Sequence, residues 1–260
     1  FDFLITHNEI EDKKFIHIAH QVIRYFELEK QIINPAYLYL IELEKWHHDT
    51  LNHSIDVAFY TLFMVSHFSN HLGELNSVFL GGLLHDIGKY LHNAEGDGEF
   101  YKIITKNGPL TSEEFELLKK HVDVKSFFKD KFQFMASKER DNILFAALDH
   151  HEKLDGSGYL QGKKGMQISL TGRIVAIADI YDAMIRRRDY KSMVRPDVAM
   201  KYIASLAEAG KLDKQYAQIF RSILGMYPTG SVLSTSHGQA LVVGQTENPE
   251  RPKVMLVDNI

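Results

Sequence analysis

The stretch that decides the fold reads Asp149-His150-His151-Glu152-Lys153-Leu154-Asp155-Gly156-Ser157-Gly158-Tyr159-Leu160. Two adjacent histidines end an apolar run, and a glycine-punctuated turn that carries one tyrosine follows them. Histidine is the commonest metal ligand in proteins, so the pair indicates a metal site if other segments supply partners. The pair alone decides little, because histidines without a ligand role are commoner.

The composition is that of a globular protein with an ordinary core. The chain has 260 residues, of which 45% are hydrophobic and 25% charged, with a net charge of −4. This charge excludes the basic footprint that long nucleic acids need. No apolar run reaches the roughly 18 residues of a membrane span. The absence of cysteine excludes disulfides and thiolate ligands and fits a reducing compartment, so we expect a cytoplasmic protein.

Apolar residues recur at helical spacing through most of the chain, which predicts an all-α fold. Helices are expected over 13–33, 37–46, 47–71, 75–87, 124–135 and 169–187, with others opened by the Thr111/Glu114 capping box, Ser137, Pro196 and Asp213. Asparagine, glycine and proline predict a long loop over 90–110. Alternating residues predict short strands at 231–235, 239–243 and 253–257.

The same patterns divide the chain into three parts. Residues 1–46 are expected to be a helical cap or the end of an upstream regulatory region, 47–230 the catalytic domain, and 231–260 a β-hairpin-like extension. The chain begins Phe-Asp-Phe rather than with methionine, which indicates a fragment. The oligomeric state is left open, and a dimer is compatible with the sequence.

Polar groups on the core-directed helices form the candidate site. They are His53, His85, Asp86, His121, His150, His151 and Asp179. Unpaired buried polar groups cost about 1–3 kcal/mol each, so a set of this size favours bound metal. Seven nitrogen and oxygen ligands exceed one tetrahedral site and suit two neighbouring ions, with Asp86 as the natural bridge. Such ligands fit iron, manganese or zinc, and paired ions are a known device for phosphoester cleavage.

Three motifs together resemble the HD-GYP domain, a family of bacterial cyclic-di-GMP phosphodiesterases within the HD phosphohydrolase superfamily. They are His85-Asp86-Ile87-Gly88-Lys89, then His150-His151-Glu152 with Asp155-Gly156-Ser157-Gly158-Tyr159, then Ala178-Asp179-Ile180-Tyr181-Asp182-Ala183. The resemblance covers roughly residues 47–230. It implies an HD-domain helical bundle with a centre of two or three metal ions, commonly iron or manganese.

The resemblance also implies roles for individual residues. The seven residues of the candidate site match the family's metal positions, and Asp86 is expected to be catalytic as well. Lys89 would aid departure of the leaving group beside the reacting phosphate. Arg188 and Lys191 would bind a substrate phosphate, and Tyr159 would line the pocket. Asp182 and Glu152 would contact the metal ligands and orient them.

Three positions depart from the family's pattern. Leu160 stands where the family has its name-giving proline, which is expected to loosen the loop without removing a ligand. Asp49 stands where three-metal members carry glutamate, so the third ion depends on a side chain that is one methylene shorter. Residues 90–110 are longer than in typical members, which is expected to alter access or substrate choice.

The activity that the resemblance implies is metal-dependent hydrolysis of cyclic-di-GMP to pGpG, with GMP left open as a further product. A hydroxide that bridges the metals would attack phosphorus. Two alternatives stay open from the sequence. The chain could be a sensor that binds a cyclic dinucleotide without efficient turnover, or an HD hydrolase of another nucleotide such as a hybrid cyclic dinucleotide.

Overall fold

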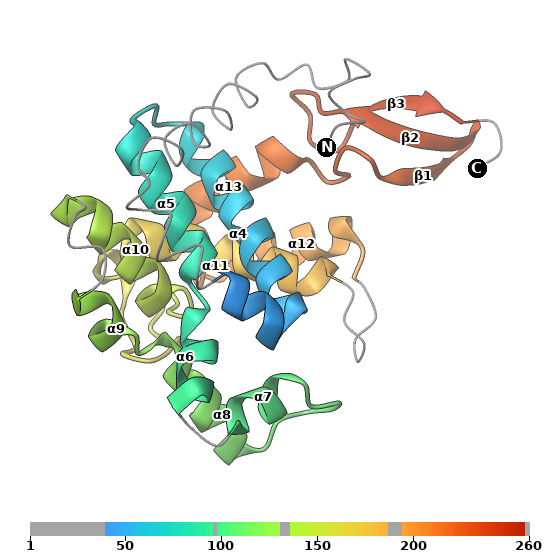
Figure 1. Ribbon diagram of the computed structural model, residues 1–260. Coiled ribbons are helices and arrows are strands. Elements are labelled where there is room, and N and C mark those ends of the chain that lie inside the picture. Colours follow the sequence, from blue (N-terminus) through green and yellow to red (C-terminus); the bar gives the residue numbers. More distant parts are fainter. Residues whose placement is uncertain (1–39, 96–97, 131–135, 187–193, 258–260) are drawn as a thin grey trace.

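The structure is a computed structural model that describes residues 40–95, 98–130, 136–186 and 194–257. Helices form the body of the molecule, and a small sheet stands at one end of it, beyond α13 (Lys214–Leu224) (Figure 1). Helices α7 (Glu99–Ile104) and α8 (Ser112–Lys119) lie at the opposite end (Figure 1). The predicted all-α class with a short β extension is therefore confirmed.

The remaining helices make up the bundle between these two ends. They are α4 His48–Ser66, α5 Leu72–Leu84, α6 Ile87–Glu95, α9 Lys125–Asp130, α10 Ser137–Asp149, α11 Leu170–Ile185 and α12 Pro196–Glu208, with 3-10 turns η1 Lys120–Val122 and η2 Gly165–Gln167. Residues 40–46 are also helical, within the segment predicted at 37–46. The helix predicted over 13–33 lies outside the described residues.

Helices α4, α5, α10 and α11 pack against one another and enclose the core. Two glycines let α5 approach its neighbours closely. A Cβ at Gly82 would lie 2.8 Å from the Cα of Ala58 on α4, and one at Gly81 would lie 2.9 Å from the Cβ of Ala146 on α10. This close packing fixes the end of α5, where the His85-Asp86 pair follows.

Several predicted helix starts are confirmed by their hydrogen bonds. The Thr111 hydroxyl accepts from Glu114 N, and the Glu114 carboxylate accepts from Thr111 N, which completes the capping box of α8. The Asp213 carboxylate caps α13, and Pro196 is the first residue of α12. Ser137 is the first residue of α10 rather than its cap, which is Ala136.

The predicted long loop over 90–110 is wrong. Helix α6 occupies Ile87–Glu95 and α7 occupies Glu99–Ile104. Gly98, at φ 82°, is the N-cap of α7, and Phe100 and Ile103 are buried residues of this helix. The helix predicted over 47–71 also ends earlier, at Ser66, and α5 begins at Leu72. Burial of short apolar segments outweighed the local loop signals in this region.

The three predicted strands are confirmed as an antiparallel sheet. Strands β1 Val232–Thr235, β2 Gly238–Gly244 and β3 Lys253–Leu256 lie in the order β1-β2-β3. Ala240 and Val242 are buried in the central strand. None of the helices among the described residues is long and apolar enough to cross a membrane.

Candidate metal centre

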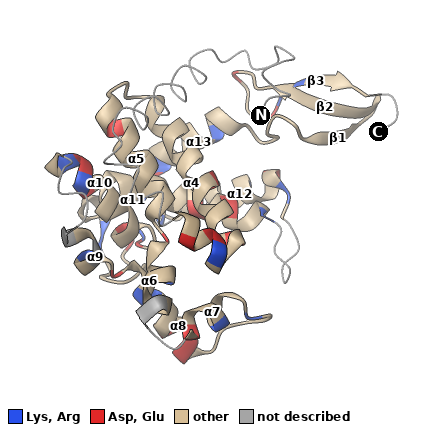
Figure 2. Ribbon diagram, in the orientation of Figure 1, with Lys and Arg blue, Asp and Glu red and all other residues tan. Residues whose placement is uncertain are grey.

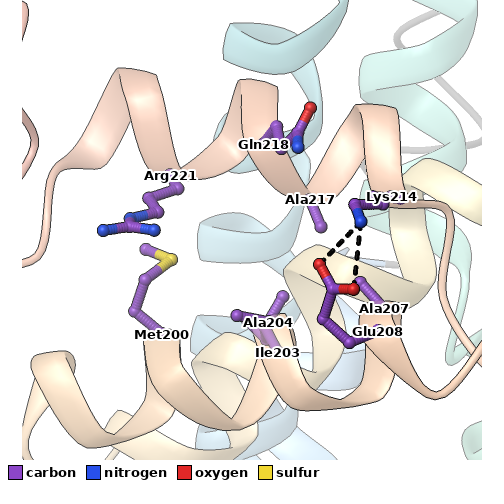
Figure 3. A pocket seen from close by; sticks show the side chains of 9 residues that line it. All are labelled: Met200, Ile203, Ala204, Ala207, Glu208, Lys214, Ala217, Gln218 and Arg221. Atoms are coloured by element: carbon purple, nitrogen blue, oxygen red, sulfur yellow. Dashed lines mark hydrogen bonds and ion pairs between the residues drawn. The ribbon is translucent and has the colours of Figure 1, made fainter.

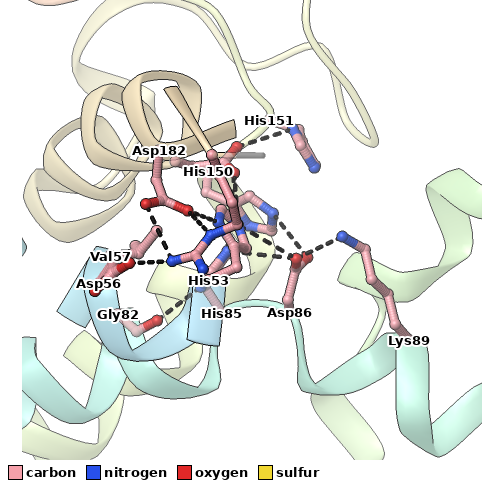
Figure 4. Close-up of polar contacts among 12 residues, drawn as sticks. His53, Asp56, Val57, Gly82, His85, Asp86, Lys89, His150, His151 and Asp182 are labelled. Carbon is pink, nitrogen blue, oxygen red and sulfur yellow. Dashed lines mark hydrogen bonds and ion pairs between the residues drawn. The ribbon is translucent and has the colours of Figure 1, made fainter. Parts of the chain in front are cut away.

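Three buried histidines lie where helices end. His85 caps the C-terminus of α5, and His150 caps that of α10. His121 lies in η1, directly after α8. Each ring is thus placed at a point where the backbone leaves the helix and the side chain can turn into the bundle. Figure 4 shows His85 and His150 gathered on one side of Asp86, with Lys89 on the other.

Each of these rings is fixed by a carbonyl of its own helix end. The Nδ1 atoms donate to Gly82 O at 2.7 Å for His85, to Leu118 O at 2.6 Å for His121, and to Ala147 O at 2.9 Å for His150. A carbonyl oxygen only accepts, so Nδ1 carries the proton. In the neutral ring Nε2 then presents a lone pair, which is the tautomer that a metal needs.

The three Nε2 atoms converge on the carboxylate of Asp86. Oδ1 of Asp86 lies 3.3 Å from His121 Nε2 and 3.7 Å from His150 Nε2. Oδ2 lies 3.5 Å from His85 Nε2 and 3.8 Å from His53 Nε2. Asp86 consequently belongs to both ligand groups among the described residues, one with His121, His150 and His151 and the other with His53 and His85.

These residues fit metal ions by an independent test. His85 Nε2 and Asp86 Oδ1 are buried and have no hydrogen-bond partner among the described residues. His121 Nε2 and His150 Nε2 lie 3.5 Å apart, although neither carries a proton to share in the tautomer fixed above. Buried lone pairs that face one another are costly unless a cation lies between them. The donor set therefore suits divalent ions bound by nitrogen and oxygen.

His53 is supported differently, by carboxylates. Its Nδ1 lies 2.6 Å from Asp182 Oδ2, and its Nε2 lies 3.1 Å from Asp179 Oδ1. Asp179 also reaches toward the second ligand group, with Oδ2 4.0 Å from His151 Nδ1. Asp182 thus lies behind His53, and Asp179 lies between the two groups.

The electrostatics of the rings follow from this support. Burial lowers the pKa of His121 to about 4 and that of His150 to about 3, so both rings are neutral near pH 7. Burial also disfavours charge on His53, but the carboxylates of Asp179 and Asp182 outweigh it and raise its pKa to about 9. Burial would raise the pKa of Asp86, yet nearby Lys89 holds it well below its usual range.

The other predicted residues lie around this cluster. Lys89 Nζ is 2.5 Å from Asp86 Oδ2. Tyr159 stacks on His151 with ring centroids 4.6 Å apart. Glu152 is buried and accepts hydrogen bonds from Gln161 N at 2.7 Å and Lys163 N at 3.0 Å. Glu152 therefore ties down the loop that carries Tyr159, although Leu160 replaces the proline there.

Asp49 lies near the cluster without joining it. It lines a cavity of about 210 Å³ together with His53, Asp86 and Lys89. Neither ligand group found among the described residues includes Asp49, so a third ion at this position stays a prediction. Arg188 and Lys191 lie outside the described residues.

The sequence did not indicate the roles of two carboxylates, those of Asp149 and Asp56. Asp149 is buried directly before the histidine pair, where its carboxylate accepts from Lys163 Nζ at 2.5 Å and Ser169 N at 2.9 Å. Arg186 Nε donates to Asp182 Oδ2 at 2.8 Å, and Arg186 also pairs with Asp56. Only the position of Asp149 beside two histidines in an apolar run could have indicated its role.

Several known proteins are similar in sequence to this chain. A cyclic di-GMP phosphodiesterase of Thermotoga maritima is 35% identical over 162 residues, 59% of this chain and 40% of that protein. A cyclic di-GMP phosphodiesterase of Pseudomonas aeruginosa is 32% identical over 209 residues, 80% of this chain and 47% of that protein. A 3'3'-cGAMP-specific phosphodiesterase of Vibrio cholerae is 30% identical over 166 residues, 64% of this chain and 36% of that protein.

The chain thus spans less than half the length of these relatives. The model of the HD domain family matches residues 43–216, which is more than half of this chain and includes every predicted ligand. The chain therefore belongs to the HD domain family, and the resemblance of its motifs to the HD-GYP domain is confirmed.

Proposed function

We propose that this chain is a metal-dependent phosphodiesterase that hydrolyses cyclic dinucleotides, with cyclic-di-GMP cleaved to pGpG as the favoured reaction. The observation that carries the proposal is the convergence of the unprotonated nitrogens of His85, His121 and His150 on Asp86. The names of the relatives support the substrate class. GMP as a second product, and the cytoplasm as the site of the reaction, belong to the same proposal.

Two ions, iron or manganese, would be held by the two ligand groups that share Asp86. One group is His53, His85 and Asp86, and the other is Asp86, His121, His150 and His151. Asp179 would contribute to both, and Asp49 would help to hold a third ion. When bound, such ions withdraw charge from a phosphate oxygen and lower the pKa of water, which makes water a nucleophile near neutral pH.

Lys89 would serve the leaving group. Its ammonium lies 2.5 Å from Asp86 Oδ2, and 20% of its side chain is exposed toward the cavity. In hydrolysis the water oxygen bonds to phosphorus and its proton passes to solvent, the ester P–O bond breaks, and the departing oxygen must take a proton. Lys89 donates that proton and is reprotonated from solvent, while Asp86 holds the ammonium in position.

The loop after the histidine pair would shape the pocket. Tyr159 is stacked on His151, and burial raises the pKa of its phenol, so it stays neutral and offers an aromatic face to the substrate. Arg188 and Lys191 would bind a substrate phosphate, as their match to the family's pattern suggests. The preference for guanine rests on the names of the relatives.

A hybrid cyclic dinucleotide is the second candidate substrate. The Vibrio cholerae relative that is 30% identical is named as specific for 3'3'-cGAMP. Both substrates carry the same two phosphodiesters, so the metal centre would serve either one. Discrimination between them would come from the walls of the cavity rather than from the ligands.

The experiment is direct hydrolysis by the chain loaded with iron or manganese under reducing conditions. Cyclic-di-GMP and 3'3'-cGAMP are supplied separately, and linear products are separated by chromatography. We expect pGpG to form faster than the hybrid product, with none formed by Asp86→Asn. Full metal occupancy without any linear product contradicts the proposal, and calorimetric binding without turnover would instead identify a sensor.

A further inference from the structure

The cavity beside the metal centre has a second end. One end is formed by His53, Asp86 and Lys89, which belong to the site described above. The other end is formed by α7, the segment that joins it to α8, and α8 itself, through Ile103, Ile104, Lys106, Gly108, Leu110 and Leu118. His47, Asp49 and Thr50 line the cavity as well. The far end has no part in the reaction derived so far.

Lys106 places a fixed cation at this far end. Its Nζ lies 2.5 Å from Glu114 Oε2, the oxygen that also accepts from Thr111 N at 2.7 Å. Glu114 is held by the capping box, so the ammonium is anchored to a helix start rather than left on a free side chain. An ammonium has three donors, and this pairing uses one of them. Figure 2 shows charged residues of both signs on α7 and α8.

The surroundings of Lys106 suit a phosphate flanked by a nucleoside. About one third (33%) of its side chain is exposed, and aliphatic Ile103, Leu110 and Leu118 share the cavity wall with it. The acidic lining residues Asp49 and Asp86 are both associated with His53. Asp49 lies one turn before His53 on α4, and Asp86 Oδ2 lies 3.8 Å from its Nε2. The far end therefore combines an apolar surface with one cation that has donors to spare.

A cyclic dinucleotide has two phosphodiesters, and only one of them can lie at the metal centre when it is cleaved. The other keeps its negative charge, and a cation beside it would offset the cost of burying that charge. We infer that Lys106 binds the phosphate that is not being cleaved, and that the aliphatic wall contacts the nucleoside between the two phosphates. This inference rests on the proposed function and names a binding residue for it.

Two substitutions that break the same ion pair test this inference. Lys106→Met removes the cation, and Glu114→Gln removes the charge that partly neutralises it while keeping a side-chain acceptor for the capping box. For cyclic-di-GMP we expect the KM to rise about tenfold in Lys106→Met and to fall about threefold in Glu114→Gln, with kcat little changed in both. If the ion pair were only structural, the KM for cyclic-di-GMP would change in the same direction in both variants.

Matched controls separate binding from damage to the metal centre. Bis(p-nitrophenyl) phosphate has a single phosphate, so its hydrolysis should be unaffected by either substitution. Lys214→Met breaks a comparable surface pair with Glu208, 2.8 Å apart, which Figure 3 shows on α12 and α13. It should leave the KM for both substrates unchanged.

The outcomes distinguish the two proposals. A wild-type chain that cleaves bis(p-nitrophenyl) phosphate but no cyclic dinucleotide would contradict the proposed function, and the Lys106 inference with it. If cyclic-di-GMP is cleaved and the KM moves in the same direction in both variants, or in neither, only the inference is overturned. Opposite shifts confined to the dinucleotide would support it.

Discussion

The two sides of the metal centre orient the same side chain by different means. On the carbonyl-backed side, formed by His85, His121 and His150, each Nδ1 donates to the backbone of its own helix end. On the carboxylate-backed side, His53 is held by Asp182 and Asp179 of α11. Asp182 lies 129 residues after His53 in the sequence. The first arrangement is local, and the second depends on tertiary packing.

This difference shows that the groups around a histidine ring set its protonation state before any ion is bound. At the carbonyl-backed rings burial outweighs the Asp86 carboxylate and lowers the pKa to about 4 for His121 and about 3 for His150. His53, equally buried, has a pKa of about 9 because carboxylates contact both of its nitrogens. The carbonyl-backed side is ready for a cation at pH 7, whereas His53 must first release a proton.

Asp86 joins the two sides, so its loss should have the largest effect. In Asp86→Asn we expect phosphodiesterase activity to fall by about a thousandfold or more, beyond the 10- to 100-fold typical of residues behind a ligand. Metal content measured by elemental analysis should fall together with activity. The exposed Asp141→Asn is the control, and an Asp86→Asn variant with full metal and half the activity would contradict the shared role.

The second prediction concerns stability without metal. Below pH 6.5 the unfolded chain protonates its histidines while folded His121 and His150 do not, so stability falls by about 1.4 kcal/mol per pH unit for each ring down to about pH 4. His53 acts oppositely, since its contribution is present below pH 6.5 and lost as pH rises through about 9. The metal-free protein should therefore be most stable near pH 6.5.

Urea unfolding of metal-free protein at several pH values measures this dependence. His121→Gln should flatten the acid limb, and exposed His237→Gln should not. An acid limb that is unchanged in His121→Gln would show that the carbonyl-backed rings are not held neutral.

The third prediction concerns a substitution that weakens only the carboxylate-backed side. Asp182→Asn removes the charge behind His53 and should reduce metal affinity by about 10- to 100-fold. Asp56→Asn should have a smaller effect, because Asp56 contacts Arg186 rather than His53. Competition with a chelator gives the affinities, and thermal unfolding checks that both variants fold. Equal effects from the two substitutions would mean that Asp182 does not act through His53.

The smallest expected effect is the number of protons released when metal binds. At pH 7.5 metal binding should release about one proton, from His53, because its folded pKa is about 9 and a ligated ring is neutral. Calorimetry in buffers of different ionisation enthalpy measures the release. Asp182→Asn should reduce it, and a release of three or more protons would mean that the carbonyl-backed rings are charged at this pH.

The sequence predicted residues on both sides of the cluster, including His53 and Asp179 on the carboxylate-backed side. His85-Asp86 and His150-His151 end apolar helices, and the number of such polar groups, together with the resemblance, predicted one site. The capping box at Thr111 and the Asp213 cap were local signals and are confirmed. The roles of these residues as ligands, and the division of the chain at 46 and 230, stay predictions.

Some pairs of residues far apart in the sequence were not predicted. Arg186 and Asp56 are 130 residues apart, and nothing near either one indicates the pair. The segment 90–110 was mistaken for a loop because its glycines and asparagines outnumber the buried positions Phe100 and Ile103 that fold it into α7. Local signals are outweighed there by burial, which only the folded chain reveals.

The location of the ligands at helix C-termini has a consequence for how ions are exchanged. The last turn of a helix carries a partial negative charge from carbonyls that lack partners, and α5 and α10 direct this end toward the cluster through His85 and His150. The backbone itself thus attracts cations, and its own hydrogen bonds hold the rings when no ion is bound. We therefore expect the proposed centre to lose and regain ions without refolding of the bundle, so that one ion could replace another in the folded protein.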